Sequence, residues 1–311
     1  MIETNPKVET VRFKKFKWVD IVAPDQAVFA ELKRKYKFHE LDLEDCASEN
    51  QRSKIDEYDK YLFIILHFPH FDKRKNAVVI EEIDVFMGHD YLITIHDGVL
   101  YPLMDVFERC RSSLKSRKKT MSNGTGFLLY EIVDTMLDHV FFLLDQVSKN
   151  IKTIELSVFG SGQEQKDMLR DILGLKKDII TFRRVMGPQR TVIAQLEHKN
   201  KRFLPENLDL YFDDLVDKVE KIWGNLESMK DLVISLQETN ESIISHKTND
   251  VIKVLTIFSA TMLPLTVLTG FYGMNVDLPM GEHPVAYFLI IGGMAVISLT
   301  MLIFFKMKRW L

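Results

Sequence analysis

The sequence lacks a surplus of charge of either sign. Its 41 Lys and Arg residues stand against 44 Asp and Glu residues, which leaves a formal net charge of -3. A chain with this balance has no overall basic footprint for nucleic acid, so we expect no nucleic-acid partner. One short basic stretch, residues 115–119, is expected to be a solvated loop.

Cysteine is scarce, with only Cys46 and Cys110 in 311 residues. They lie far apart and outside any Cys-x-x-Cys or Cys/His cluster, so a disulfide framework and a zinc site are disfavoured. We expect two free thiols in a reducing compartment. The first residues also lack the apolar segment of a secretory signal peptide, so the N-terminus is expected to stay in the cytosol.

Signatures of catalysis are missing as well. The sequence contains no Gly-rich phosphate loop and no His-Glu-x-x-His motif, and no set of Ser, His and Asp stands out. These absences predict a protein that is not an enzyme and has no organic cofactor.

Long apolar runs are present instead, near the C-terminus. Residues 254–272 and 285–305 carry no charge, and each run is long enough to cross about 30 Å of hydrocarbon as a helix. Lys253 precedes the first run, and Lys306, Lys308 and Arg309 follow the second, whereas the connecting loop has no Lys or Arg. The positive-inside rule therefore places both termini in the cytosol and the loop outside. We expect a multi-pass protein of the cell (inner) membrane.

The rest of the chain predicts two cytosolic regions. Residues 1–125 read as an α/β domain, with strand character at 8–22, 61–66, 77–86 and 90–96 and helices after Pro24 and at 38–47. Residues 126–250 show apolar residues at alternating spacings of three and four, which predicts three long helices. Gly187-Pro188 is expected to kink or break the second of these. The third is expected to continue into the membrane region 251–311, which divides into spans at about 252–272 and 285–305 and an outer loop at 273–284.

One face of the first span mixes small, hydroxyl and aliphatic residues. Its members recur every three or four positions: Ile252, Leu255, Ser259, Leu263, Thr266 and Gly270. Two spans cannot enclose a pore, so an ion pathway on this face requires an oligomer. Ordinary packing of small residues between membrane helices is the alternative.

The first span ends in Tyr272-Gly273-Met274-Asn275 at the outer surface. Helix C-termini carry partial negative charge, so several of them together favour a cation. Asn275 would add neutral amide oxygens, and Asp277 and Glu282 of the loop would raise the local cation concentration. Mg²⁺ loses water reluctantly, so such a ring would bind it through its waters. Neither span contains an acid or base, which argues against a proton relay.

The Gly-Met-Asn motif after the first of two C-terminal spans resembles the signature of the CorA magnesium transporter family. The similarity extends through residues 254–275, and further matches occur at Leu43-Glu44-Asp45, at Gln51-Arg52, between residues 83 and 96, and in the basic tail. The resemblance covers essentially the whole chain. It implies a funnel-shaped homopentamer in the lipid bilayer, with the first spans lining a pore.

The resemblance also implies roles for individual residues. Gly273, Met274 and Asn275 would form the selectivity mouth. The pore-facing positions would be Asn249, Ile252, Leu255, Ser259, Leu263, Thr266 and Gly270, with Ile252, Leu255 and Leu263 as a hydrophobic gate. Cytosolic Mg²⁺ would be sensed between subunits by Asp214, Glu238 and, more weakly matched, Asp72. Lys218 stands where some members have a His ligand.

These observations predict a passive Mg²⁺ channel that the membrane potential drives and cytosolic Mg²⁺ closes. A transporter of another divalent cation, Co²⁺, Ni²⁺ or Zn²⁺, with or without proton coupling, is a close alternative. A membrane-anchored coiled-coil scaffold without transport is a remote one.

Overall fold

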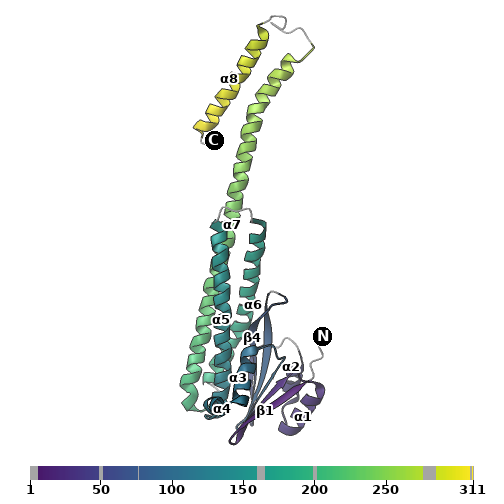
Figure 1. Cartoon of the computed structure of the whole chain (residues 1–311), viewed down its shortest axis with the longest axis vertical. Helices are drawn as coiled ribbons and strands as arrows, with labels where there is room; N and C mark the ends of the chain where they lie inside the picture. The colour runs from purple at the N-terminus through teal and green to yellow at the C-terminus, as the bar shows by residue number, and fades with distance from the viewer. Residues whose placement is uncertain are drawn as a thin grey trace. The chain divides into compact units, whose positions relative to one another are not determined.

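The computed structural model describes residues 6–48, 52–75, 77–159, 165–198, 202–275, 285–308 and 310 (Figure 1). The chain divides into two compact units, Met1–Gln237 and Glu238–Leu311. The strands are β1 Lys7–Phe13, β2 Phe16–Val22, β3 Lys54–Glu57, β4 Leu62–Asp72, β5 Ala77–Met87 and β6 Tyr91–His96. The helices are α1 Gln26–Tyr36, α2 Glu40–Ala47, α3 Tyr101–Ser112, α4 Leu114–Met121, α5 Thr125–Phe159, α6 Gln165–His198, α7 Asp209–Tyr272 and α8 Ala286–Met307, with a short 3-10 turn at Glu206–Leu208.

The first unit contains a six-stranded sheet in the order β1-β2-β6-β5-β4-β3. β2 and β6 run parallel, and the other neighbours are antiparallel. This confirms the predicted α/β domain. The predicted strand segment 8–22 is in fact two strands, because the chain reverses at Lys14-Lys15 and Phe13 pairs with Phe16.

At β4 both faces of the sheet are buried, as a continuous apolar strand requires. In β4, Phe63 and Ile65 belong to the core under α1 and α2, together with Leu32 and Phe86. The alternate residues are also fully buried, and β4 contacts α5 and α6. The period of two along β4 therefore places one set of side chains against each helical layer.

The basic stretch 115–119 lies in a helix, so its prediction as a loop was wrong. The Ser113 side chain caps α4 by accepting a hydrogen bond from the N–H of Ser116 at 3.3 Å. Thr120 and Met121 are buried at the other end of the helix. A cap and one buried turn fold these residues although most of their side chains are exposed.

The three predicted long helices are confirmed as α5, α6 and α7. The residues at the three-four spacings are buried, for example Val140 and Leu144 in α5 and Leu215, Val219 and Ile222 in α7. A break at Gly187-Pro188 was one of two expected outcomes, and it is wrong because α6 continues through Pro188.

The residue after this proline anchors α6 to the sheet. Gln189 is fully buried, and its Oε1 accepts a hydrogen bond from the N–H of His67 at 2.9 Å. The β3–β4 pairing ends at Ile65, so Gln189 supplies the acceptor that a longer β3 would have given.

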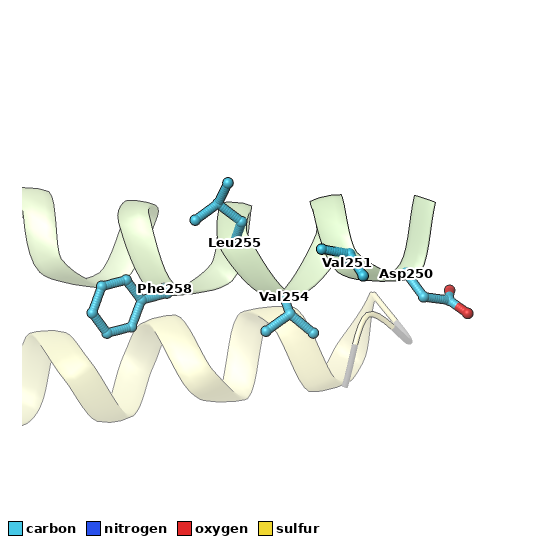
Figure 2. Close-up of a pocket in the computed structure, with 5 residues that line it drawn as sticks. All are labelled: Asp250, Val251, Val254, Leu255 and Phe258. Atoms are coloured by element: carbon cyan, nitrogen blue, oxygen red, sulfur yellow. The ribbon is translucent and has the colours of Figure 1, made fainter. Parts of the chain in front are cut away.

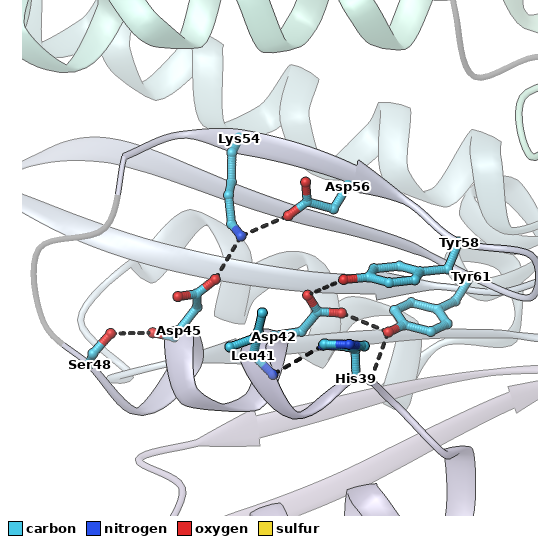
Figure 3. Close-up of polar contacts among 9 residues, drawn as sticks. All are labelled: His39, Leu41, Asp42, Asp45, Ser48, Lys54, Asp56, Tyr58 and Tyr61. Carbon is cyan, nitrogen blue, oxygen red and sulfur yellow. Dashed lines mark hydrogen bonds and ion pairs between the residues drawn. The ribbon is translucent and has the colours of Figure 1, made fainter.

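A polar network holds α2 against β3 and against the segment between β3 and β4 (Figure 3). The buried carboxylate of Asp42 accepts hydrogen bonds from the phenols of Tyr58 at 2.8 Å and Tyr61 at 2.7 Å. The ammonium of Lys54 lies 2.6 Å from Asp45 and 2.7 Å from Asp56. Asp45 belongs to one of the stretches that carry the family resemblance, and in this fold it forms an ion pair with Lys54.

One buried carboxyl group gives a stability prediction. Asp84 in β5 is 3% exposed, and its Oδ1 has no hydrogen-bond partner among the described residues. Burial, and then the nearby Glu82 carboxylate, raise the pKa of Asp84 well above its usual value. A carboxyl group whose pKa is raised by folding stabilises the fold at low pH and loses that contribution as pH rises toward the folded-state pKa.

We therefore expect Asp84→Asn to raise the thermal midpoint at pH 7, by about 2–4 °C for each kcal/mol of relieved ionisation cost. At pH 4 the variant and the wild type should melt together, because the carboxyl is then protonated. Thermal unfolding at both pH values tests this, with the exposed Asp217→Asn as control. A lower midpoint at pH 7 would contradict the prediction.

Candidate ion pathway and regulatory carboxylates

Two of the described helices are long and apolar enough to cross a membrane, in the segments Glu206–Tyr272 and Tyr287–Met307. Only 6% of the apolar window of each is buried within the chain. This distinguishes them from the core helix of a soluble domain, which would be mostly buried. They coincide with the end of α7 and with α8.

Within the second unit, α8 lies beside one side of α7 (Figure 2). That side of α7 is marked by reduced exposure: Ile257 is 8% exposed, and Ala260, Thr261, Pro264, Leu265 and Leu268 are partly buried. An α-helix turns by about 100° per residue, so these residues form a single stripe.

The predicted pore face lies on the other side of α7. Leu255 is 62% exposed and Leu263 66%, and Ile252, Ser259, Thr266 and Gly270 are exposed as well. The helical period places the centre of this stripe roughly 160° from the side that faces α8. α8 therefore does not cover the predicted face.

An apolar groove flanks this stripe at the start of the span (Figure 2). Its lining residues are Asp250, Val251, Val254, Leu255 and Phe258. Asp250 is the charged member, and its carboxylate lies 3.3 Å from the Lys253 ammonium. Leu255 thus belongs both to the predicted pore face and to the adjoining groove.

The hydroxyl groups of α7 are oriented by the helix itself. The Thr266 hydroxyl donates to the carbonyl of Met262 at 2.9 Å, and Thr256, Thr261 and Thr269 make the same bond one turn back. Each proton is thereby directed to the backbone, which leaves acceptor lone pairs on the oxygen. On the predicted pore face, Thr266 thus offers an acceptor suited to the water molecules of a hydrated cation.

The helix ends where the motif begins. The N–H of Gly273 donates to the carbonyl of Thr269 at 2.9 Å, and the N–H of Met274 donates to Phe271 at 3.4 Å. A Cβ at Gly273 would lie 3.0 Å from the Thr269 carbonyl oxygen, closer than a side chain normally approaches backbone. Glycine thus permits this close turn, and Asn275 follows it with an exposed side chain. Asp277 and Glu282 lie outside the described residues.

The predicted sensor residue Asp214 is exposed on α7, at the edge of a charged cluster. One turn later, the Lys218 ammonium binds the carboxylates of Asp134 and, at 2.8 Å, of Asp138, both on α5. Burial first, and then the charges of Asp134 and Asp214, raise the pKa of the Tyr130 phenol to about 12. Asp134 and Asp138 are residues that the sequence interpretation missed, and only their spacing of four on α5 hinted that they share a face.

The other two predicted sensor residues have different surroundings. Glu238 is exposed on α7. Asp72 ends β4, where its Oδ1 accepts hydrogen bonds from the N–H groups of Arg74 at 2.8 Å and Lys75 at 3.3 Å. These bonds lower the pKa of Asp72. In the part of the chain that the structure describes, no group of three or more His, Cys, Asp or Glu side chains is placed to hold a metal ion.

Comparison with known proteins gives consistent results. The family model described as CorA-like Mg²⁺ transporter protein matches residues 13–309. The protein YfjQ of Bacillus subtilis is 31% identical over 301 residues, which cover 94% of this chain and 89% of that protein. The cobalt/magnesium transport protein CorA of Thermotoga maritima is 28% identical over 275 residues, 88% of this chain and 77% of that protein. The complete structure of the CorA magnesium transporter from Methanocaldococcus jannaschii superposes with a TM-score of 0.84 at 22% identity, covering 98% of this chain and 95% of that one.

Proposed function

Because the chain belongs to the family of CorA-like Mg²⁺ transporter proteins, we propose that it conducts Mg²⁺ passively into the cell through a pore built by five copies. The observation that carries this proposal is the exposed stripe on α7, which lies away from α8 and leads to Gly273-Met274-Asn275. Five such stripes facing one another enclose a pathway that a single pair of spans cannot.

The membrane potential supplies enough energy for uptake. Moving one elementary charge across 100 mV is worth about 2.3 kcal/mol, so a divalent ion gains about 4.6 kcal/mol. No nucleotide is required.

Selection takes place at the mouth, where Asn275 contributes neutral amide oxygens. A ring of these oxygens accepts hydrogen bonds from the water shell of Mg²⁺ without holding the ion as tightly as carboxylates would. In the outer half of the span, Thr266 offers the same kind of acceptor to the hydrated ion. The polar residues therefore stabilise an ion that keeps its water.

Closure is assigned to cytosolic Mg²⁺ bound between subunits at Asp214, with Glu238 and Asp72 as further carboxylates. At low internal Mg²⁺ these negative charges repel one another across the subunit boundary. Bound Mg²⁺ cancels that repulsion and stabilises the closed arrangement, in which Ile252, Leu255 and Leu263 exclude water from the pathway.

Co²⁺ is the second candidate cargo, because the Thermotoga relative is named a cobalt/magnesium transport protein. The family resemblance implies that Met274 in the motif favours Mg²⁺ over Zn²⁺, because a similar zinc-transporting branch replaces this methionine. Ni²⁺ and proton-coupled transport are further variants of the same alternative.

Flux measurements in liposomes test the proposal. The protein is reconstituted, and uptake of Mg²⁺, Co²⁺, Ni²⁺ and Zn²⁺ is followed while membrane potential, proton gradient and internal Mg²⁺ are varied separately. We expect Mg²⁺ uptake that grows with an inside-negative potential, ignores the proton gradient and stops at high internal Mg²⁺. Uptake that depends on the proton gradient would favour the alternative, and no ion flux by a folded oligomer would favour a scaffold.

Asp214→Ala should weaken inhibition by internal Mg²⁺, because one carboxylate is lost at each subunit boundary. We expect the inhibitory Mg²⁺ concentration to rise several-fold while maximal flux is retained. Asp213→Ala is the matched control, since it removes the adjacent exposed carboxylate. An unchanged inhibition curve for Asp214→Ala, or an equal shift for both variants, would contradict the assigned role.

A further inference from the structure

The tip of the β1–β2 hairpin carries positive charge without carboxylate partners. Arg12, Lys14 and Lys15 are exposed and Lys17 is partly exposed, and none of the four has an ion pair with an acidic side chain among the described residues. Lys35 of α1 extends the same surface, since the ammonium groups of Lys17 and Lys35 lie 5.0 and 5.5 Å from the ring centre of Tyr36. The nearest ion-pair partner of Lys35 is Glu31, at the outer limit of 4.0 Å. We call these five residues the hairpin surface.

The pairing of the strands brings like charges together. Arg12 lies directly opposite Lys17 in the antiparallel ladder, so both side chains point to the same face of the sheet. Like charges in directly opposed positions destabilise a strand pair. The fold therefore keeps an unfavourable pair of like charges next to the turn of the hairpin.

The turn itself is unfavourable for its residues. Lys14 has φ 51°, in the left-handed region, and Lys15 is not in that region. A positive φ at only the first position of a two-residue hairpin loop is the pattern that favours glycine there. A lysine is not favoured by the backbone conformation at position 14. A residue kept in an unfavourable conformation at an exposed site points toward a function for its side chain.

We propose that the hairpin surface binds a short polyphosphate anion, of the class formed by inorganic polyphosphates and nucleoside triphosphates. Phosphate oxygens accept charge-assisted hydrogen bonds from several ammonium and guanidinium groups at once, which relieves the repulsion between Arg12 and Lys17. The strand rise and the strand spacing place the backbones of the four hairpin residues within about 10 Å of one another, and Lys35 joins them beside the ring of Tyr36. That extent suits two or three linked phosphates rather than a long polymer. This binding does not depend on the transport proposed above.

Titration calorimetry of the full-length protein in detergent tests the proposal, with inorganic tripolyphosphate as the probe, in Mg²⁺-free buffer at constant ionic strength. The decisive variant is Lys14→Gly/Lys15→Asn. It removes two charges and installs residues that the turn prefers, so it should weaken binding at least tenfold while the thermal midpoint stays level or rises. Loss of binding through misfolding is thereby separated from loss of the surface.

The matched control is Lys118→Gln/Lys119→Gln, which removes two exposed charges from α4. We expect it to bind tripolyphosphate within about twofold of the wild type. Equal weakening in both variants would mean a general charge effect and overturn the proposal. No binding to the wild type, binding that sulfate reproduces at equal ionic strength, or binding of an RNA oligonucleotide in place of tripolyphosphate would also overturn it.

Discussion

Asn275→Ala is expected to lower Mg²⁺ uptake into liposomes at least tenfold. The side chain is exposed just beyond the end of α7, where the last helix carbonyls also point. In the proposed pentamer the change removes five amide oxygens that accept hydrogen bonds from the hydrated ion. A net hydrogen bond is worth about 1 kcal/mol, so losing two of the five already costs about 2 kcal/mol. A barrier raised by about 1.4 kcal/mol slows transport tenfold.

The control for Asn275→Ala is Thr300→Ala on α8. The Thr300 hydroxyl already donates to the carbonyl of Val296 at 2.8 Å, so its removal should leave uptake nearly unchanged. If the Asn275→Ala protein assembles normally and its Mg²⁺ flux is undiminished, the motif does not take part in ion selection.

Asn275→Asp tests whether the neutrality of the amide matters as well as its oxygen acceptor. A carboxylate keeps the oxygen acceptors but adds negative charge at the mouth, which holds a divalent ion more strongly. We therefore expect saturation at lower external Mg²⁺ together with a lower maximal rate. Asn275→Ala should instead lower the rate at every concentration.

The long helices followed from the sequence because their signal is local. Apolar residues at spacings of three and four define one buried side, and the buried residues of α5 and α7 occupy those positions. Strand β4 followed for a similar reason, since a short apolar run between polar segments is typical of a strand buried on both faces. The charge-free runs near the C-terminus marked the two candidate membrane helices in the same way.

The sequence interpretation failed where the local signal is weak or where the contact joins residues that are far apart in the sequence. The hairpin turn at Lys14-Lys15 has neither Gly nor Asn, so nothing marked the reversal between β1 and β2. Helix α4 has few apolar residues, and it was missed because its cap and its last buried turn carry the folding signal. The contacts of Lys218 with Asp134 and Asp138 join residues 84 and 80 positions apart, which no periodicity reveals.

The candidate ion pathway was likewise predictable from the sequence only in part. The stripe from Ile252 to Gly270 could be predicted because a helical period fixes which residues share a face. The position of this stripe away from α8 could not be predicted from the sequence, because two antiparallel helices can pack through any of their sides. The reduced exposure of Ile257 and Pro264 supplies that information.

Leu263→Asn is expected to let Mg²⁺ pass at internal concentrations that close the wild-type protein. Leu263 lies between Ser259 and Thr266 on the predicted pore face, so in a pentamer it forms an apolar ring between two polar rings. A narrow apolar ring excludes water and with it a hydrated ion, and an amide at the same place retains water. We expect flux at high internal Mg²⁺ to rise at least fivefold.

Leu299→Asn on α8 is the matched control, because Leu299 is 60% exposed and Leu263 is 66% exposed. It makes the same substitution on the helix that is not predicted to line the pore, and it should still close. A Leu263→Asn protein that closes at the same internal Mg²⁺ as the wild type would move the constriction elsewhere.

Combining Leu263→Asn with Asp214→Ala tests whether the two residues contribute to the same closing step. If the carboxylate acts by closing the apolar ring, the double variant should conduct no more at high internal Mg²⁺ than Leu263→Asn alone, because the ring no longer excludes water. Independent effects would instead multiply, since distant and uncoupled sites add in free energy. A multiplied flux would therefore separate Asp214 from the gate, whereas a shared maximum places the regulatory carboxylate and the apolar ring on one closing step.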